Sequence, residues 1–170
     1  MNNKTGYPDY HTVLHNEEPN QTFLKVNQDS KVLESHCGLN DRTHLLKCLL
    51  YFAFKNNLTL IRPQFRLGLY HQYPLKNEHY RKQPNPWRLS DLSEYYDFSK
   101  LRINGHLVET LDFSENPPPD LNCIEVSFNG PSWFESKRYL VDLLVNEEGW
   151  GKISLPHKPD IISKALEITS

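Results

Sequence analysis

One short segment concentrates side chains that could bind an anionic ligand. It reads Gly38-Leu39-Asn40-Asp41-Arg42 and joins a strand candidate, residues 32–37, to an apolar helix. The amide groups of a first helical turn attract anions, and in open parallel sheets this junction faces the ligand crevice. With one glycine and no Gly-Lys-Ser or Gly-Lys-Thr sequence, it is neither a dinucleotide fingerprint nor a phosphate loop. The plainer alternative is that Gly38 makes the turn, Asn40 caps the helix and Arg42 is solvated.

A second group of candidate binding residues follows the next strand. The segment Arg66-Leu67-Gly68-Leu69-Tyr70-His71 comes shortly after the apolar residues 58–61. The ring of Tyr70 could cover the apolar face of a sugar, and the imidazole of His71 could hydrogen-bond to its hydroxyl groups. The alternative is an ordinary loop with a histidine on its surface.

The three cysteines give no sign of a metal site or a disulfide scaffold. Cys37, Cys48 and Cys123 form no Cys-x-x-Cys pair and have no zinc-like spacing with histidine, so no structural metal is expected. Cys37 stands beside His36, but neighbours in an extended strand point to opposite faces. This geometry favours an inert thiol over an activated nucleophile.

Composition argues against several classes of function. The chain has 170 residues, of which 38% are hydrophobic and 12% aromatic, which indicates a folded domain. Its net charge is −2, from 19 basic and 21 acidic residues without a basic run, which argues against nucleic-acid binding. The longest apolar stretch, 45–54, is interrupted by Lys47 and is too short to span a bilayer. The N-terminus shows no signal-peptide pattern, and the sequence leaves the compartment undecided.

The elements around the first segment predict a strand–helix–strand unit. Asn40 is a favourable N-cap, and apolar residues on more than one face from 42 to 55 predict a helix buried between a sheet and another helix. Asn56-Asn57 end it, because asparagine tolerates the left-handed conformation. Residues 58–61 form a short apolar strand, which we expect to lie parallel to and beside residues 32–37.

The remainder of the chain predicts further strands and helices around one irregular segment. Residues 1–22 are polar and rich in turn formers, which predicts a loosely attached lead-in before an ordered part that starts at residue 23 or 32. Residues 64–93 are expected to be irregular. The other expected elements are helical turns at 92–101, strands at 107–109 and 124–128, and helices at 134–145 and 161–168.

Four stretches resemble the GDP-fucose protein O-fucosyltransferases, in particular the type that modifies thrombospondin repeats. They are Gly38–Arg42 before the apolar helix, Leu58–Pro63, Leu69–His71, and Ser93–Leu101 followed by Leu107–Glu109. The resemblance covers about residues 32–113. It implies an α/β fold, with a Rossmann-like parallel sheet and flanking helices, that forms the amino-terminal half of a GT-B glycosyltransferase.

The resemblance also implies a domain organisation and a set of partners. Residues 1–22 would be the lead-in, 23–155 the acceptor-side domain, and 156–170 a helix leading to a donor domain that the chain does not contain. Enzymes of that family transfer fucose from GDP-fucose to a Ser or Thr hydroxyl, with inversion and without a metal, and they are typically in the secretory pathway. The implied partners are therefore a nucleotide sugar and a protein acceptor. The candidate substrate-binding residues are Gly38, Asn40, Arg42, Tyr70 and His71.

The residues that would perform the chemistry depart from the family pattern. The His-x-Arg-Arg motif of the donor domain does not occur in the chain, and Cys37 stands where the resembling type has a glutamate as general base. No catalytic residue is assigned for this reason. The sequence thus predicts a fucosyltransferase-like half-enzyme that binds no cofactor tightly and does not turn over alone, with GDP-fucose as donor if a second domain is supplied.

The alternative is a non-catalytic glycan-binding or protein-binding domain on the same fold. The two hypotheses differ in what they predict for the surface. A half-enzyme should leave the crevice around Gly38, Arg42, Tyr70 and His71 open to solvent beside an apolar patch. It should also have a final helix, 161–168, that is weakly docked or covers part of that patch.

Overall fold

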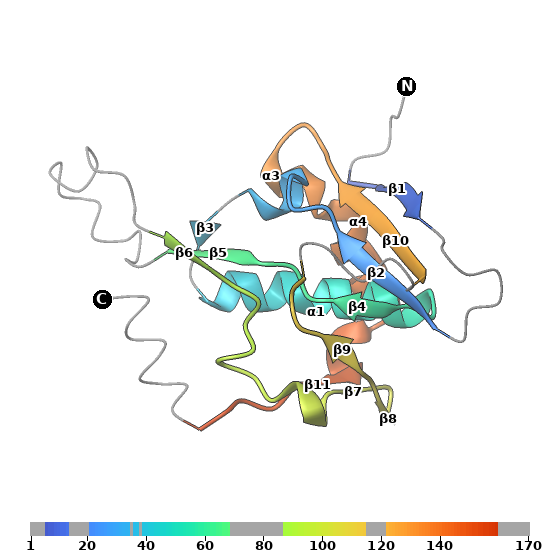
Figure 1. Ribbon diagram of the computed structural model, residues 1–170, viewed down its shortest axis with the longest axis vertical. Coiled ribbons are helices and arrows are strands. Elements are labelled where there is room, and N and C mark those ends of the chain that lie inside the picture. The colour runs from blue at the N-terminus through green and yellow to red at the C-terminus, as the bar shows by residue number, and fades with distance from the viewer. Residues whose placement is uncertain are drawn as a thin grey trace, which may run out of the picture.

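The core of the protein is a mixed five-stranded sheet with helices packed against it (Figure 1). The computed structural model describes residues 6–13, 21–34, 36–37, 39–68, 87–114 and 122–159. The strand order is β1 (Pro8–Val13), β10 (Asn122–Phe128), β2 (Thr22–Val26), β4 (Thr59–Ile61) and β9 (Thr110–Leu111). All neighbours are parallel except β1, which pairs antiparallel with β10. The prediction of an α/β fold is confirmed at this level.

The predicted strand–helix–strand unit exists, but its first strand is β2 and not residues 32–37. β2 and β4 are parallel neighbours, and α1 (Leu39–Lys55) lies between them in the chain. Phe23, Leu24 and Val26 are all buried, so β2 is covered on both faces, as a central parallel strand must be.

Residues 32–37 fold differently, so the predicted pairing with 58–61 is wrong. Lys31–Leu33 form a 3₁₀ turn, η1, which buries the adjacent pair Val32 and Leu33 together. A strand would have sent these two side chains to opposite faces. β3 (His36–Cys37) then pairs with β5 (Phe65–Gly68) in a separate sheet of order β3-β5-β6, in which β6 is Trp87–Ser90. The same two strands, β5 and β6, correct the expectation that residues 64–93 are irregular throughout.

Helix α1 has the environment that its apolar residues predict, and it begins at Leu39, before the predicted start. It buries side chains on several faces, and Phe52 contacts both the ring of Phe128 on β10 and that of Tyr139 on the neighbouring helix. Asn57 adopts the left-handed conformation at φ 57°, and the amide of Asn56 donates to the carbonyl of Phe52. The predicted end of the helix is confirmed.

Residues near the N-terminus belong to the folded domain and do not form a loose lead-in. β1 is an edge strand, where a proline as first residue costs no ladder hydrogen bond. Gly6 has φ +69°, and a Cβ at this position would lie 2.5 Å from the backbone oxygen of Ser136. The ring of Tyr7 packs 4.7 Å from that of Tyr139. These contacts fasten the segment to the helices beside the sheet.

The second half of the chain supplies a helical layer and a small hairpin sheet. The predicted helix 134–145 is present as two pieces, α3 (Trp133–Ser136) and α4 (Arg138–Asn146), followed by the 3₁₀ turn η4 (Gly149–Lys152). α4 packs against α1, and α3 packs against η1. The predicted strand 124–128 lies within β10 and is confirmed. The remaining elements are β7 (Arg102–Ile103), β8 (His106–Leu107), β11 (Ile153–Ser154) and the turn η3 (Phe98–Lys100).

Two further predictions concern the C-terminal helix and membrane-spanning segments. The predicted helix 161–168 lies outside the described residues. Within the described part of the chain, no helix has the length and apolar character needed to cross a membrane.

Candidate functional site

The two loops singled out from the sequence start from neighbouring strand ends. β3 and β5 are parallel, with Cys37 opposite Leu67, so both strands end at the same edge of their sheet. One residue, Gly38, separates the end of β3 from Leu39, where α1 begins. β5 ends at Gly68, from which the chain leads to Tyr70 and His71. Figure 1 shows β3 and β5 beside the N-terminal end of α1.

The structure places only part of the predicted site. Gly38, Tyr70 and His71 lie outside the described residues, as does the side chain of Cys37. Asn40 is exposed within the first turn of α1. Because the helix begins one residue earlier, at Leu39, Asn40 is not the residue that caps it, and that prediction is wrong.

Arg42 is the most unusual residue of this region, because it is charged and fully buried. Its exposed fraction is 0%, so the expectation of a solvated or solvent-open Arg42 is wrong. Within the described part of the chain, its Nε, Nη1 and Nη2 have no hydrogen-bond partner. Its Cζ lies 5.3 Å from the ring centroid of Trp133, which offers a cation–π contact but accepts no conventional hydrogen bond.

Burial of this guanidinium has a large free-energy cost. Taking an ion out of water costs several kcal/mol even after the protein relaxes, and an ion pair or hydrogen bonds must offset it. Arginine remains protonated, so it cannot escape this cost by losing its charge. Arg42 therefore marks a position at which an added anion would stabilise the folded protein.

The first turn of α1 is fixed by a contact with the segment after β6. The hydroxyl of Thr43 donates to the carbonyl of Leu39 at 2.9 Å and lies 2.7 Å from the phenolic oxygen of Tyr96. Burial raises the pKa of Tyr96, although the bond with Thr43 acts in the opposite direction. The phenol is thus neutral near pH 7 and can act as a hydrogen-bond donor beside this turn.

A second arginine lies at the carboxyl end of the central sheet, but its charge is paired with carboxylates, and only its Nε has no partner among the described residues. Arg62 follows β4 and is 3% exposed. It donates to Thr110, Asp91 and Asp112, and its Cζ lies 4.0 Å from the ring centroid of Phe98. Arg62, Phe98, Thr110 and Asp112 line an open hollow of about 570 Å³. Because its charge is already compensated, Arg62 is best explained as a structural link between β4, β9 and the segment after β6.

Asp91 gives this link a dependence on pH. Partial burial by itself would raise the pKa of its carboxyl group. Hydrogen bonds from the side chain and backbone of Ser93 and from the backbone of Phe113, together with the charge of Arg62, outweigh burial and lower the pKa. The folded protein therefore binds this proton less readily than the unfolded chain, in which the value is about 3.9.

We expect Asp91→Asn to make the stability of the protein less sensitive to acid. A lowered pKa contributes stability that is present above the unfolded value of about 3.9 and is lost as the pH falls through the folded value. The wild type should therefore lose more free energy of unfolding than the variant between about pH 5 and pH 2. Urea unfolding at a series of pH values measures this, and parallel curves for the two proteins would contradict it.

Other candidate chemistry receives no support from the described residues. In the described ranges, no group of three His, Cys, Asp or Glu side chains could hold a metal ion. Burial raises the pKa of Cys48 to about 12, against the opposing charge of Lys137, and burial also raises the pKa of Cys123. Both thiols remain protonated at neutral pH and are poor nucleophiles.

Sequence reasoning missed Trp133 and the burial of Arg42, although a signal for the latter exists. Arg42 precedes Leu45, Leu46 and Leu49 by three, four and seven residues, which is the spacing of one helix face. A charge on the buried face of a helix calls for a partner, and this spacing could have shown it. Trp133 gives no comparable local signal, because only the fold brings it to α1.

Comparison of the chain with known protein families, with curated proteins and with solved structures found no match.

Proposed function

We propose that this protein is a fucosyltransferase-like domain in which Arg42 holds the anionic part of a nucleotide sugar. Its fold would be the Rossmann-like amino-terminal half of a GT-B glycosyltransferase, and its partners would be GDP-fucose and a protein acceptor. The observation that carries the proposal is the fully buried guanidinium of Arg42, which has no hydrogen-bond partner among the described residues.

The position of Arg42 suits a phosphate ligand. Its guanidinium can donate two parallel hydrogen bonds to phosphate oxygens, and such charge-assisted pairs are about twice as strong as neutral ones. Arg42 lies in the first turns of α1, a helix of 17 residues whose N-terminal amide groups also favour an anion. Asn40 on the same turn is exposed and can add a polar contact.

The same features limit the affinity that we expect. Arg42 is covered, so a ligand reaches it only through a local opening, and the apparent affinity falls with the fraction of open molecules. One arginine also holds a diphosphate less tightly than several would, and the chain has no His-x-Arg-Arg sequence. We therefore propose weak binding of GDP-fucose and no fucose transfer by the 170-residue chain alone.

Replacing Arg42 by methionine tests the proposal. Removing an unpaired buried charge and filling its space with an apolar chain should raise the free energy of unfolding by roughly 1–4 kcal/mol. The same variant should lose the weak binding of GDP-fucose that the wild type shows by calorimetry or ligand-observed NMR. Arg42→Lys, which keeps a charge but not the planar fork, is the control and should gain no stability.

Three results would contradict the proposal. A clear loss of stability in Arg42→Met would mean that the guanidinium makes internal contacts that support the fold. Unchanged ligand binding in that variant would remove Arg42 from the site. Micromolar affinity of the wild type for GDP-fucose would show a donor site more complete than the one that we propose.

The second candidate is a non-catalytic glycan-binding or protein-binding domain on the same fold. Residue 37 favours it, because a cysteine stands where the resembling enzymes have a glutamate as general base. A thiol accepts a proton from an alcohol poorly, so the fold could be kept for recognition alone. Release of GDP from GDP-fucose in the presence of a protein acceptor would decide for the enzyme.

A further inference from the structure

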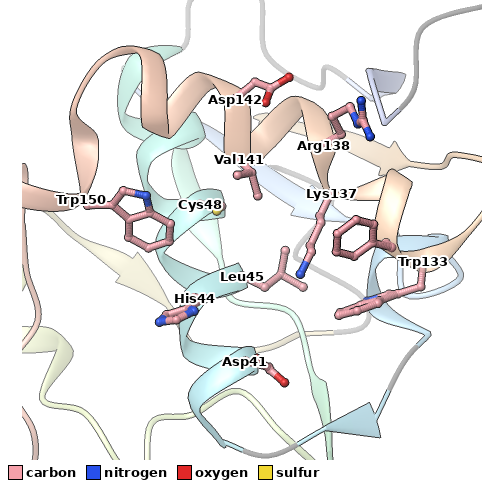
Figure 2. Close-up of a pocket in the computed structure, with 11 residues that line it drawn as sticks. Asp41, His44, Leu45, Cys48, Trp133, Lys137, Arg138, Val141, Asp142 and Trp150 are labelled. Atoms are coloured by element: carbon pink, nitrogen blue, oxygen red, sulfur yellow. The ribbon is translucent and has the colours of Figure 1, made fainter.

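A cavity of about 430 Å³ lies on the helical side of the molecule, across Trp133 from Arg42. Its volume falls within the range of about 300–1,000 Å³ that small-molecule sites occupy. Leu45 and Cys48 of α1 and Val141 of α4 provide apolar surface, and the rings of Trp133, Phe134 and Trp150 provide the rest. Figure 2 shows Trp133 and Trp150 on opposite sides, with α1 between them.

Two of these rings are held in place by the surrounding structure. The indole nitrogen of Trp133 donates to the backbone carbonyl of Val32 at 2.9 Å. The ring of Trp150 packs edge-on against His44, with the centroids 5.4 Å apart. Fixed aromatic rings on two sides favour a ligand with an aromatic body, because offset and edge-to-face ring contacts add to the burial of apolar area.

The charge that points into the cavity is positive. Asp41, Arg138 and Asp142 also line the cavity. In Figure 2 the ammonium group of Lys137 points to the centre, whereas the charged groups of these three side chains point away from it. The Nζ of Lys137 lies 4.3 Å from the ring centroid of Trp133 and 5.3 Å from that of Phe134. Throughout the described ranges, no carboxylate lies within ion-pair distance of this Nζ.

The carboxylates of Asp41 and Asp142 also line the cavity, but among the described residues neither forms an ion pair with this ammonium group. The nearby thiol of Cys48 stays protonated at neutral pH, because burial raises its pKa to about 12. The contacts with the two rings leave ammonium protons free to meet a ligand, since the rings are not conventional hydrogen-bond acceptors.

We propose that this cavity binds a small aromatic carboxylate. The aromatic body lies between Trp133 and Trp150, and the carboxylate accepts hydrogen bonds from the ammonium group of Lys137. Arg42 is not among the described residues that line the cavity, although it packs against Trp133, which forms one wall. The two proposals can still fail separately, because each is tested with its own ligand and its own variants.

Calorimetry with three ligands of one shape and different charge tests this site. We choose 1-naphthylacetate, its neutral amide 1-naphthylacetamide, and the cationic 2-(1-naphthyl)ethylamine. The carboxylate should bind about tenfold or more tightly than the amide, which is the size of effect that one charge-assisted hydrogen bond gives. The amine should bind more weakly than the amide.

Two neighbouring cations on the helical layer supply a matched pair of variants. Lys137→Gln should abolish the preference for the carboxylate while it leaves the affinity for the amide unchanged. Arg138→Gln removes the same charge from a side chain that points away from the cavity, and it should keep the preference. If both variants bind the amide as tightly as the wild type does, the cavity remains folded in them.

The proposal is overturned by any of four results. These are no binding of the three compounds at millimolar concentration, equal binding of carboxylate and amide, an unchanged preference in Lys137→Gln, and an equal loss of preference in Arg138→Gln. The second result would mean that the cavity binds apolar ligands without requiring a charge. The last would mean that the summed positive charge of the helical layer, and not Lys137 in particular, attracts the carboxylate.

Discussion

Arg62→Ala is expected to lower the free energy of unfolding by about 3–5 kcal/mol, the usual cost of removing one partner from a buried ion pair. Asp91 is only 13% exposed and would lose its cation, and Thr110 would lose its partner across β4 and β9. Phe98 would lose the guanidinium that lies over its ring. Asp112 is 86% exposed and contributes little. Because whole domains are stable by about 5–15 kcal/mol, this variant should be at the limit of folding.

Urea unfolding followed by circular dichroism measures this effect. The control is Lys100→Ala, since Lys100 is 71% exposed and lies 3.9 Å from Asp97 on the surface. This variant should unfold almost like the wild type. A loss of less than about 1 kcal/mol in Arg62→Ala would show that the arginine network does not join β9 to the sheet, since breaking such a pair normally costs several times more.

Phe52→Ala is the second variant with a large expected effect, also about 3–5 kcal/mol. Phe52 is 1% exposed and joins three elements, because its ring contacts Phe128 on β10 and Tyr139 on α4 from its place on α1. Its removal leaves a cavity at the centre of the core that the rigid sheet cannot close. The free energy of unfolding from a denaturant series is again the measurement.

Phe54→Ala is the matched control for this variant. Phe54 lies on the same helix but is only partly buried, so its removal should cost clearly less. Equal losses for the two variants would indicate that the loss of a helical phenylalanine, and not the cavity between α1, β10 and α4, sets the cost.

Local signals in the sequence account for the elements that were predicted correctly. The dense apolar residues and the terminal asparagines define α1, and alternation identifies the core of β10. Pairing between strands depends on distant residues, so it was predicted poorly. Residues 32–37 and β2 both look like short apolar strands. The turn at residues 31–33 is held by a distant side chain, because the indole nitrogen of Trp133 donates to the backbone carbonyl of Val32. The polar composition of residues 1–22 likewise hid β1, because an edge strand needs few buried side chains.

The chemistry of the candidate site was easier to predict than its surroundings. An arginine in the first turns of a helix suggests an anion, and that part of the prediction stays a proposal. Its burial depends on side chains brought from far along the chain, such as Trp133. The cavity beside Lys137 could not be predicted at all, because α1, α3, α4 and η4 each contribute only part of its wall.

The place of β10 between β1 and β2 determines when the sheet can form during synthesis. Both partners of β10 are made about one hundred residues earlier, as the hydrogen bond from Phe128 to Ser30, 98 positions apart, illustrates. A ribosome adding about 5–20 residues per second needs roughly 5–20 s to cover that distance. During this time the edge of β2 that later pairs with β10 has no neighbouring strand. Such an unpaired strand edge with exposed apolar side chains favours association with chaperones. The nascent chain should thus complete its core late and in one step, when the last central strand emerges.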